Sequence, residues 1–160
     1  MRRSIQHQSG SRKAFLNAIC HASADGSTNR CGRFEFFAFP SYFTNVTGTN
    51  QCLANWKALT GVWPPIRIGG TTQDRASYDA STSAYVVYTV ASPADAPATL
   101  TFGSKFMTLA NTYAGTVVMG LNRGKNDLAN TIAAAKVAVS EMGNLLAIEL
   151  GNEPECEQPT

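Results

Sequence analysis

The chain has 160 residues, of which 44% are hydrophobic and 15% are charged, and its formal net charge is +2. This composition is typical of a globular protein, and the length suits one domain that buries a real core. The basic residues near the start form no patch interleaved with aromatic residues, so we expect no nucleic-acid partner. No apolar run reaches the roughly 18 residues that span a bilayer, so we expect no membrane partner.

Residues 1–32 are polar and have no regular hydrophobic pattern, so we expect an irregular leader there and the folded domain over 33–160. The best candidate for a secretion signal, AFLNAICHA, is short and is interrupted by Asn17 and His21, so no signal peptide is recognisable. The triplet NVT at Asn45 is a glycosylation sequon if the chain is secreted, although such triplets also arise by chance.

The four cysteines show no CxxC pair and no histidine spacing typical of zinc, so we expect no metal and no cofactor. An even number allows one or two disulfides, and buried or free thiols explain the pattern equally well. They are Cys20, Cys31, Cys52 and Cys156.

From residue 33 the chain alternates between strand-like and helix-like segments. We predict strands over 33–40, 64–70, 116–122 and 144–152, and helices over 51–61, 104–115 and 126–143. The polar segment 71–103 is longer than an ordinary loop of such folds, and its AYVVYTV stretch predicts a small extra strand. Regular alternation of apolar strands and helices predicts an α/β fold with parallel strands.

The helix over 126–143 has the clearest pattern. Asn126 or Asp127 is placed to cap its start, Gly61 is placed to end the earlier helix over 51–61, and Gly143 to end this one. The apolar residues that we expect on one buried face are Leu128, Ile132, Ala135, Val139 and Met142.

Strand periodicity gives each predicted strand one apolar face and one face of small or polar residues. Glu35, Arg67 and Glu149 fall on the polar faces of three strands, so we expect them to converge. Arginine neutralises carboxylates through forked hydrogen bonds, which favours a buried ion network that holds the strands together. Direct contact of these residues with a sugar is the alternative.

Asn152 and Glu153 follow the last apolar strand directly, and Pro154 stiffens the turn behind them. Parallel barrels place their chemistry at the carboxyl ends of the strands. The segment RIGGTTQD lies at the end of another predicted strand, so the two polar segments are expected at the same edge.

Four segments, FEFFAFP, PPIRIGGTTQDRASYDAS, GLNRGKND and LLAIELGNEPE, together resemble glycoside hydrolase family 79 in the same order over residues 33–155. The likeness is to the fungal β-glucuronidase-like branch, which is related to heparanase. It implies a partial (β/α)8 TIM barrel of about four strand–helix units, an extracellular location, and a carbohydrate partner that contains β-linked glucuronic acid.

The resemblance also implies roles for individual residues. Glu153 corresponds to the general acid/base, and Asn152 to the residue that binds the sugar near its 2-hydroxyl. Thr71, Thr72 and Asp74 are implied at the sugar site, and Glu35 is a further candidate for substrate binding.

A retaining glycosidase needs a second carboxylate about 5–5.5 Å from the acid, to attack the anomeric carbon. In the resembled family this nucleophile is a glutamate on a later strand, and the chain stops at Thr160. Along an extended chain Glu149 is about 13 Å from Glu153, which is too far, and Glu155 is about 7 Å away beyond Pro154. We therefore expect an N-terminal fragment of a retaining β-glucuronidase-type barrel that carries the acid/base half of the site, has little or no activity alone, and has open sheet edges that allow self-association.

Two other functions remain open from the sequence. A non-catalytic glycan-binding module would use Asn152, Arg67 and the 71–80 loop without a nucleophile. Nucleotide binding through IRIGGTTQD is the weaker alternative, because neither GxGxxG nor GxxxxGK[ST] is present.

Overall fold

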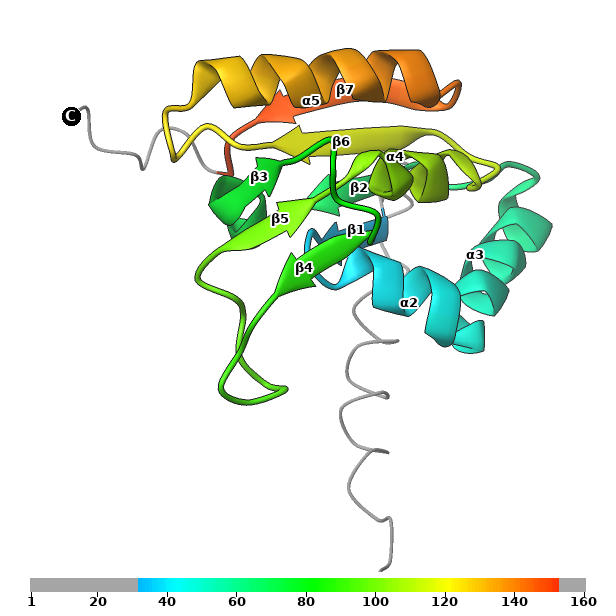
Figure 1. Cartoon of the computed structure of the whole chain (residues 1–160). Coiled ribbons are helices and arrows are strands. Elements are labelled where there is room, and N and C mark those ends of the chain that lie inside the picture. Colours follow the sequence, from blue (N-terminus) through cyan, green and yellow to red (C-terminus); the bar gives the residue numbers. More distant parts are fainter. Residues whose placement is uncertain (1–31, 153–160) are drawn as a thin grey trace, which may run out of the picture.

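The computed structural model describes residues 32–152, which form an α/β fold (Figure 1). The predicted leader lies outside these residues, except for Gly32. In chain order the elements are β1 (Gly32–Glu35), α2 (Phe39–Asn45), α3 (Thr47–Thr60), β2 (Ile66–Gly69), the 3-10 helix η1 (Thr71–Arg75), β3 (Ala76–Tyr78), β4 (Val86–Tyr88), β5 (Leu100–Phe102), α4 (Ser104–Asn111), β6 (Val117–Leu121), α5 (Leu128–Glu141) and β7 (Leu145–Leu150).

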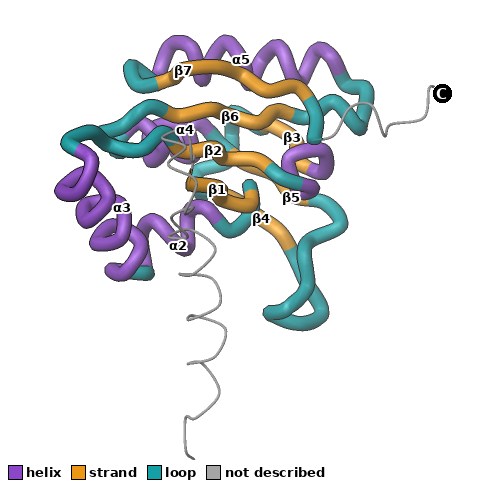
Figure 2. Tube along the Cα trace, turned by 180° about the vertical axis from the view of Figure 1, so that it is seen from behind, coloured by secondary structure: helices purple, strands orange, loops and turns teal. Residues whose placement is uncertain are grey.

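The main sheet has the order β1-β2-β6-β7, and all of its neighbouring strands pair in parallel. Its strands lie in front of the helices when the molecule is viewed from behind (Figure 2), so one face of the sheet is covered by helices. This confirms the predicted α/β class and parallel strands, and it matches about four strand–helix units of a partial TIM barrel. No helix among the described residues is long and apolar enough to cross a membrane.

The covered face of the main sheet forms the core. The residues that point to this face alternate along their strands with residues that point to the other face, and each is at most 1% exposed: Phe34, Ile66, Ile68, Val117 and Met119. The neighbouring helices complete this core with a group of aromatic rings. The rings of Phe36 and Phe106 are stacked with their centroids 4.5 Å apart. Burial of these side chains is the main driving force that fixes the helices on this face.

The long segment after β2 folds into η1 and a small mixed sheet of order β3-β5-β4. The predicted extra strand over 84–90 is confirmed as β4. The three-residue strands β3 and β5 were not predicted. The small sheet is joined to α5 by the amide of Asn130, which accepts from the backbone N–H of Tyr78 at 2.8 Å and donates to its carbonyl at 2.7 Å.

The predicted strand over 33–40 is too long. β1 ends at Glu35, and a new helix, α2, begins at Phe39 with Pro40 in its first turn. Proline suits the first turn of a helix because its missing N–H has no partner to lose there. The aromatic run therefore divides between a strand and a helix. The predicted end of the next helix at Gly61 is confirmed, since Gly61 has φ +82° and its N–H donates to Lys57.

The predicted buried face of α5 is confirmed at Met142, which is 3% exposed, and wrong for its larger residues on the helix. Leu128 and Val139 are each 67% exposed and Ile132 is 44% exposed, whereas Ala134 and Ala138 are buried. Small side chains let the helix approach the sheet closely, so the alanine face lies inward and the larger apolar residues point away. The predicted cap at the start is confirmed, because Asp127 accepts from the N–H of Asn130 at 3.1 Å.

The observed orientation of α5 predicts that a leucine has unequal effects on stability at two adjacent positions. Ala138→Leu inserts a large side chain at a fully buried site, and we expect it to lower the free energy of unfolding by about 1–3 kcal/mol. Val139→Leu changes an exposed position, and we expect a change within about 0.5 kcal/mol. Urea unfolding of both variants measures the difference, and equal effects would contradict the orientation.

Candidate functional site

The carboxyl ends of the four parallel strands meet at one edge of the main sheet, which we call the rim. Glu35 ends β1, the pair Gly69–Gly70 ends β2, Asn122 follows β6 and Asn152 follows β7. Their polar side chains are close to one another because parallel strands present the same ends at the same edge. The description stops at Asn152, so the predicted acid Glu153 and the turn at Pro154 lie outside the described residues.

An ion pair crosses the face of the sheet opposite the α-helices, just below the rim. The guanidinium of Arg67 donates from Nε to Glu149 Oε2 at 2.7 Å and makes a second, shorter bond from Nη2 to Oε1. Arg67 lies on β2 and Glu149 on β7, so the pair reaches over β6, where Gly120 lies beside Glu149. The glycine has no side chain to obstruct the contact. Nη2 of Arg67 also donates to Asn152 Oδ1 at 3.1 Å, which links the ion pair to the rim.

Glu35 forms a different set of contacts from the predicted ion network. Its Oε1 accepts from the backbone N–H of Thr72 at 2.7 Å and from the Thr72 hydroxyl at 2.6 Å. Gly70, with φ +89°, makes this possible, because a Cβ at that position would collide with the Glu35 carboxylate. The described hydrogen bonds therefore place Glu35 against η1, while Arg67 and Glu149 form the ion pair.

Asp74 on η1 binds three backbone N–H groups of the two loops that follow β6 and β7 at the rim. Its Oδ1 accepts from the N–H groups of Arg123 at 2.8 Å and Gly124 at 3.0 Å, and its Oδ2 accepts from the N–H of Asn152 at 2.6 Å. A carboxylate that accepts three backbone N–H groups fixes their positions through charge-assisted hydrogen bonds. The contacts of Asp74 thus hold the loops after β6 and β7 in place.

The threonines suggested by the resemblance differ in exposure. Thr71 is exposed at the rim, whereas Thr72 is fully buried, with its hydroxyl bound to Glu35 and also accepting from the N–H of Phe37 at 3.3 Å. Sugar contact by Thr71, Thr72 and Asp74 stays a prediction.

Gln73 was not identified from the sequence and occupies the middle of the rim. It is fully buried, and its amide lies against Gly69 and Gly120, where an added Cβ would collide with Oε1. Its Nε2 donates to Leu121 at 3.4 Å, and its Oε1 has no hydrogen-bond partner among the described residues. The signal in the sequence was the presence of glycines on the small-residue faces of two adjacent strands.

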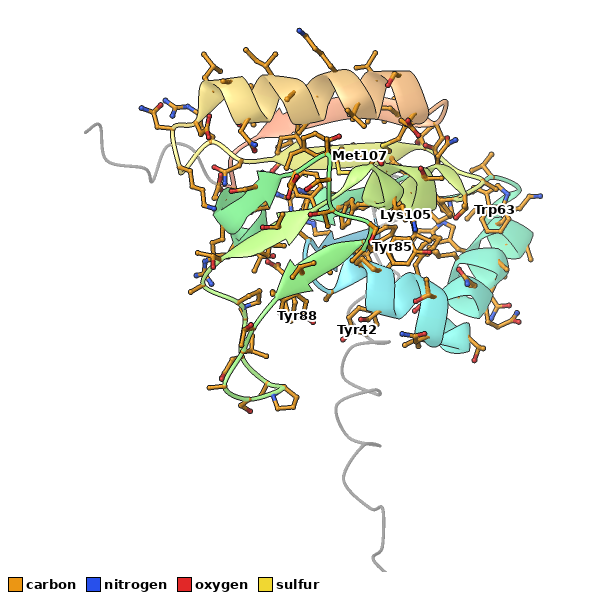
Figure 3. All side chains as sticks on the ribbon, viewed as in Figure 1. Tyr42, Trp63, Tyr85, Tyr88, Lys105 and Met107 are labelled. Carbon is orange, nitrogen blue, oxygen red and sulfur yellow. The ribbon has the colours of Figure 1, made fainter. Side chains whose placement is uncertain are left out.

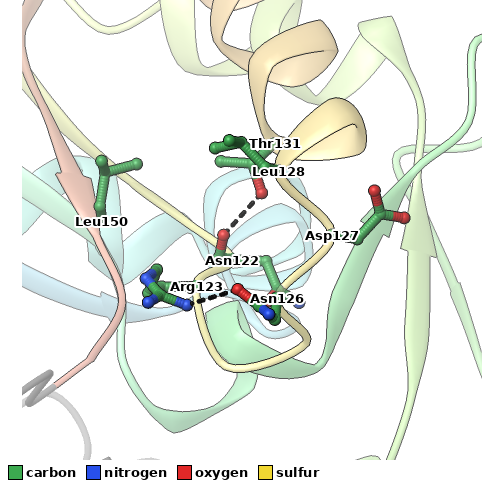
Figure 4. A pocket seen from close by; sticks show the side chains of 7 residues that line it. All are labelled: Asn122, Arg123, Asn126, Asp127, Leu128, Thr131 and Leu150. Atoms are coloured by element: carbon green, nitrogen blue, oxygen red, sulfur yellow. Dashed lines mark hydrogen bonds between the residues drawn. The ribbon is translucent and has the colours of Figure 1, made fainter. Parts of the chain in front are cut away.

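A small pocket of about 180 Å³ lies beside the rim, between the start of α5 and the end of β7 (Figure 4). In it Arg123 donates to Asn126 at 3.0 Å and Thr131 donates to the carbonyl of Asn122 at 2.6 Å. This volume is below the ~300–1,000 Å³ of typical ligand pockets, so these contacts serve mainly to shape the loop. Within residues 32–152 no group of three His, Cys, Asp or Glu side chains is arranged to hold a metal ion.

Comparisons with known proteins place this geometry in context. No model of a known protein family matches the chain. The chain is 37% identical over 135 residues to a β-glucuronidase of Aspergillus niger and 34% identical over 137 residues to a β-glucuronidase of Neurospora crassa. Each alignment covers 76% of this chain but only 25% and 24% of the respective relative, so the chain spans about a quarter of the length of the curated relatives it matches.

Among solved structures, the chain is similar to a 4-O-α-L-rhamnosyl-β-D-glucuronidase from Fusarium oxysporum in complex with Rha-GlcA. The TM-score is 0.77 and the identity is 63%, with 79% of this chain and 28% of that chain covered. The predicted resemblance to fungal β-glucuronidases is thereby confirmed over part of the chain.

The ion pair predicts a characteristic pattern in a double-mutant cycle. Arg67→Met leaves the partly buried Glu149 carboxylate without its forked partner, and we expect the free energy of unfolding to fall by about 1–3 kcal/mol. Adding Glu149→Met removes the uncompensated charge, so the double variant is expected to lose less than the two single variants together. Additive losses in urea unfolding would show that the pair does not couple β2 to β7.

Asp74→Ala tests whether the Asp74 carboxylate fixes the loops after β6 and β7. Without the carboxylate, the amides of Arg123, Gly124 and Asn152 lose their acceptor, and we expect their hydrogen exchange to accelerate by at least about tenfold. Amides in the middle of β2 and β6 are expected to exchange as before.

Asp79→Ala is the matched control for this experiment. Hydrogen bonds from the side chain and backbone of Ser81 hold the pKa of Asp79 below its ordinary value, so it is also an ionised hydrogen-bond acceptor. These contacts stay within its own turn, and we expect faster exchange there and no change at Asn152. Faster exchange at Asn152 in both variants would indicate general loosening and would contradict a specific role of Asp74 in fixing these loops.

Proposed function

We propose that the chain carries the acid/base half of a retaining β-glucuronidase site, of the glycoside hydrolase family 79 type, at the rim of its parallel sheet. In this proposal Glu153 is the general acid/base and Asn152 contacts the sugar near its 2-hydroxyl. The observation that carries the proposal is a pair of hydrogen bonds that fix Asn152. Its N–H donates to Asp74, and its side-chain oxygen accepts from Arg67. Two fixed bonds one residue before the proposed acid favour a preorganised site.

The proposed chemistry requires a carboxylic acid that protonates the leaving glycosidic oxygen and later removes a proton from water. Glu153 follows a residue that is fixed at the carboxyl end of β7, where parallel barrels present their catalytic groups. The nucleophile is proposed to come from a later strand of a longer barrel, as the resemblance implies. The substrate class, β-linked glucuronides in glycans, is likewise a proposal that rests on the relatives.

A chimaera tests the acid/base role of Glu153. Residues 33–155 would replace the corresponding segment of the Fusarium oxysporum relative, and hydrolysis of aryl β-glucuronides would be measured. We expect Glu153→Gln to lower kcat/KM by roughly 10²–10⁴-fold for a poor leaving group, and by less for an acidic phenol that needs little protonation. The alkaline limb of the pH–rate profile is expected to disappear with the acid.

Glu155→Gln is the matched control, because it makes the same change two residues further along the chain. We expect it to retain activity with an unchanged pH profile. Equal losses in both variants, or a loss that does not depend on the leaving group, would refute the assignment of Glu153. Turnover by the 160-residue chain alone that depends on Glu153 would refute the proposed need for a later nucleophile.

The second candidate is a non-catalytic glycan-binding module that uses Asn152 and the exposed Thr71. It is favoured by the polar groups that the rim presents without a second catalytic carboxylate among the described residues. Calorimetric titration of the chain with glucuronic acid tests it: saturable binding at millimolar or lower concentration that is lost in Asn152→Ala supports binding, and no saturation excludes it.

A further inference from the structure

A cleft of about 520 Å³ lies between α2, the loop before β4, β4 itself and the start of α4. It is on the helical side of the molecule, away from the ion pair on the opposite face of the sheet. Figure 3 shows the labelled side chains of Tyr85, Tyr88 and Lys105 where β4 and α4 approach α2. Its volume falls within the range of about 300–1,000 Å³ of pockets that hold small molecules.

The lining of the cleft combines aromatic rings with hydroxyl groups. Tyr85 is 39% exposed and Tyr88 is 36% exposed, and both line the cleft together with Ser41 and Thr44 on α2. The ring of Tyr88 is held by an edge contact with Phe37, with the centroids 5.4 Å apart. Rigid rings with polar edges, flanked by hydroxyl groups, suit the apolar faces and hydroxyls of sugar rings.

The same cleft is lined by Asn45, the acceptor residue of the only N-x-Ser/Thr sequon in the sequence. Asn45 is the exposed last residue of α2, followed by Val46 in an extended conformation. Its side chain has no hydrogen-bond partner among the described residues, so attachment of a sugar to its amide would break no described contact.

Cys52 supplies an independent indication of the compartment, because it is disulfide-bonded and its partner lies outside the described residues. Disulfides form and persist in oxidising compartments such as the secretory pathway, where sequons are also glycosylated. The sequence alone left both the cysteines and the sequon undecided, and the disulfide favours a compartment in which the sequon can be modified.

We propose that Asn45 carries an N-linked glycan whose first sugar rings lie in this cleft against Tyr85 and Tyr88. Asn45 and the two tyrosines line the same cleft, so a glycan attached to Asn45 starts next to the aromatic rings that it would contact. The glycan would cover rings that are otherwise exposed and would tie α2 to β4. This inference does not depend on the proposed catalysis at the rim.

Occupancy of the site is tested by translating the chain behind a secretion signal in the presence of microsomes, which reports modification even when the product does not fold. We expect one step of added mass that peptide N-glycosidase removes and that Asn45→Gln and Thr47→Ala each abolish. Asn55→Gln, an exposed asparagine outside any sequon, is the control and is expected to keep the added mass. An unmodified parent chain would overturn the proposal.

The position of the glycan is tested on glycosylated chain secreted from yeast, by following its trimming with an endoglycosidase. We expect slow trimming of the native parent chain and a roughly three- to tenfold faster rate in Tyr85→Ala, because the sugar loses an aromatic contact. Val87→Ala changes the next-but-one residue, which does not line the cleft, and is expected to trim like the parent. Equal rates in all three chains would show that the glycan lies outside the cleft.

Discussion

The pairing of Arg67 with Glu149 is the interaction on which the rim depends. Both charges lie on the face of the main sheet opposite the α-helices, and their contact joins β2 to β7 across β6. Removing either partner leaves a partly buried charge whose desolvation is no longer compensated. Asn152 accepts a hydrogen bond from the same guanidinium, so the position of its side chain depends on a residue 85 positions earlier in the chain.

Glycines determine how closely these polar groups approach the sheet. Gly120 on β6 lies beside Glu149 on β7, and together with Gly69 it provides the surface against which the Gln73 amide lies. Gly70 allows the Glu35 carboxylate to reach the N–H and hydroxyl of Thr72. The helix η1 therefore packs on the small-residue face of the sheet. This packing positions Asp74 beside the loops after β6 and β7.

The alternation of strands and helices was sufficient to predict the parallel sheet, and the alternation of residues along the strands was sufficient to predict its two unlike faces and the meeting of Arg67 with Glu149. It was insufficient for α5, because a helical pattern shows that an apolar stripe exists but not which neighbour covers it. Ala134 and Ala138 face the sheet since their size permits close packing, and Leu128 is left outside. The role of Asp74 was also beyond the pattern, because its partners are backbone N–H groups that no residue type reveals.

One group of exposed large apolar residues lies at the β7 edge of the main sheet. Leu146 and Leu150 on β7 are 61% and 53% exposed, beside the exposed stripe of α5. A further strand–helix unit of a complete barrel would pack at this edge. The bonds that fix Asn152, in contrast, come from Arg67 and Asp74 in the second unit. Asn152, the residue before the proposed acid, is therefore held by contacts within the described residues, whereas the apolar edge is where a further strand–helix unit of a barrel would pack.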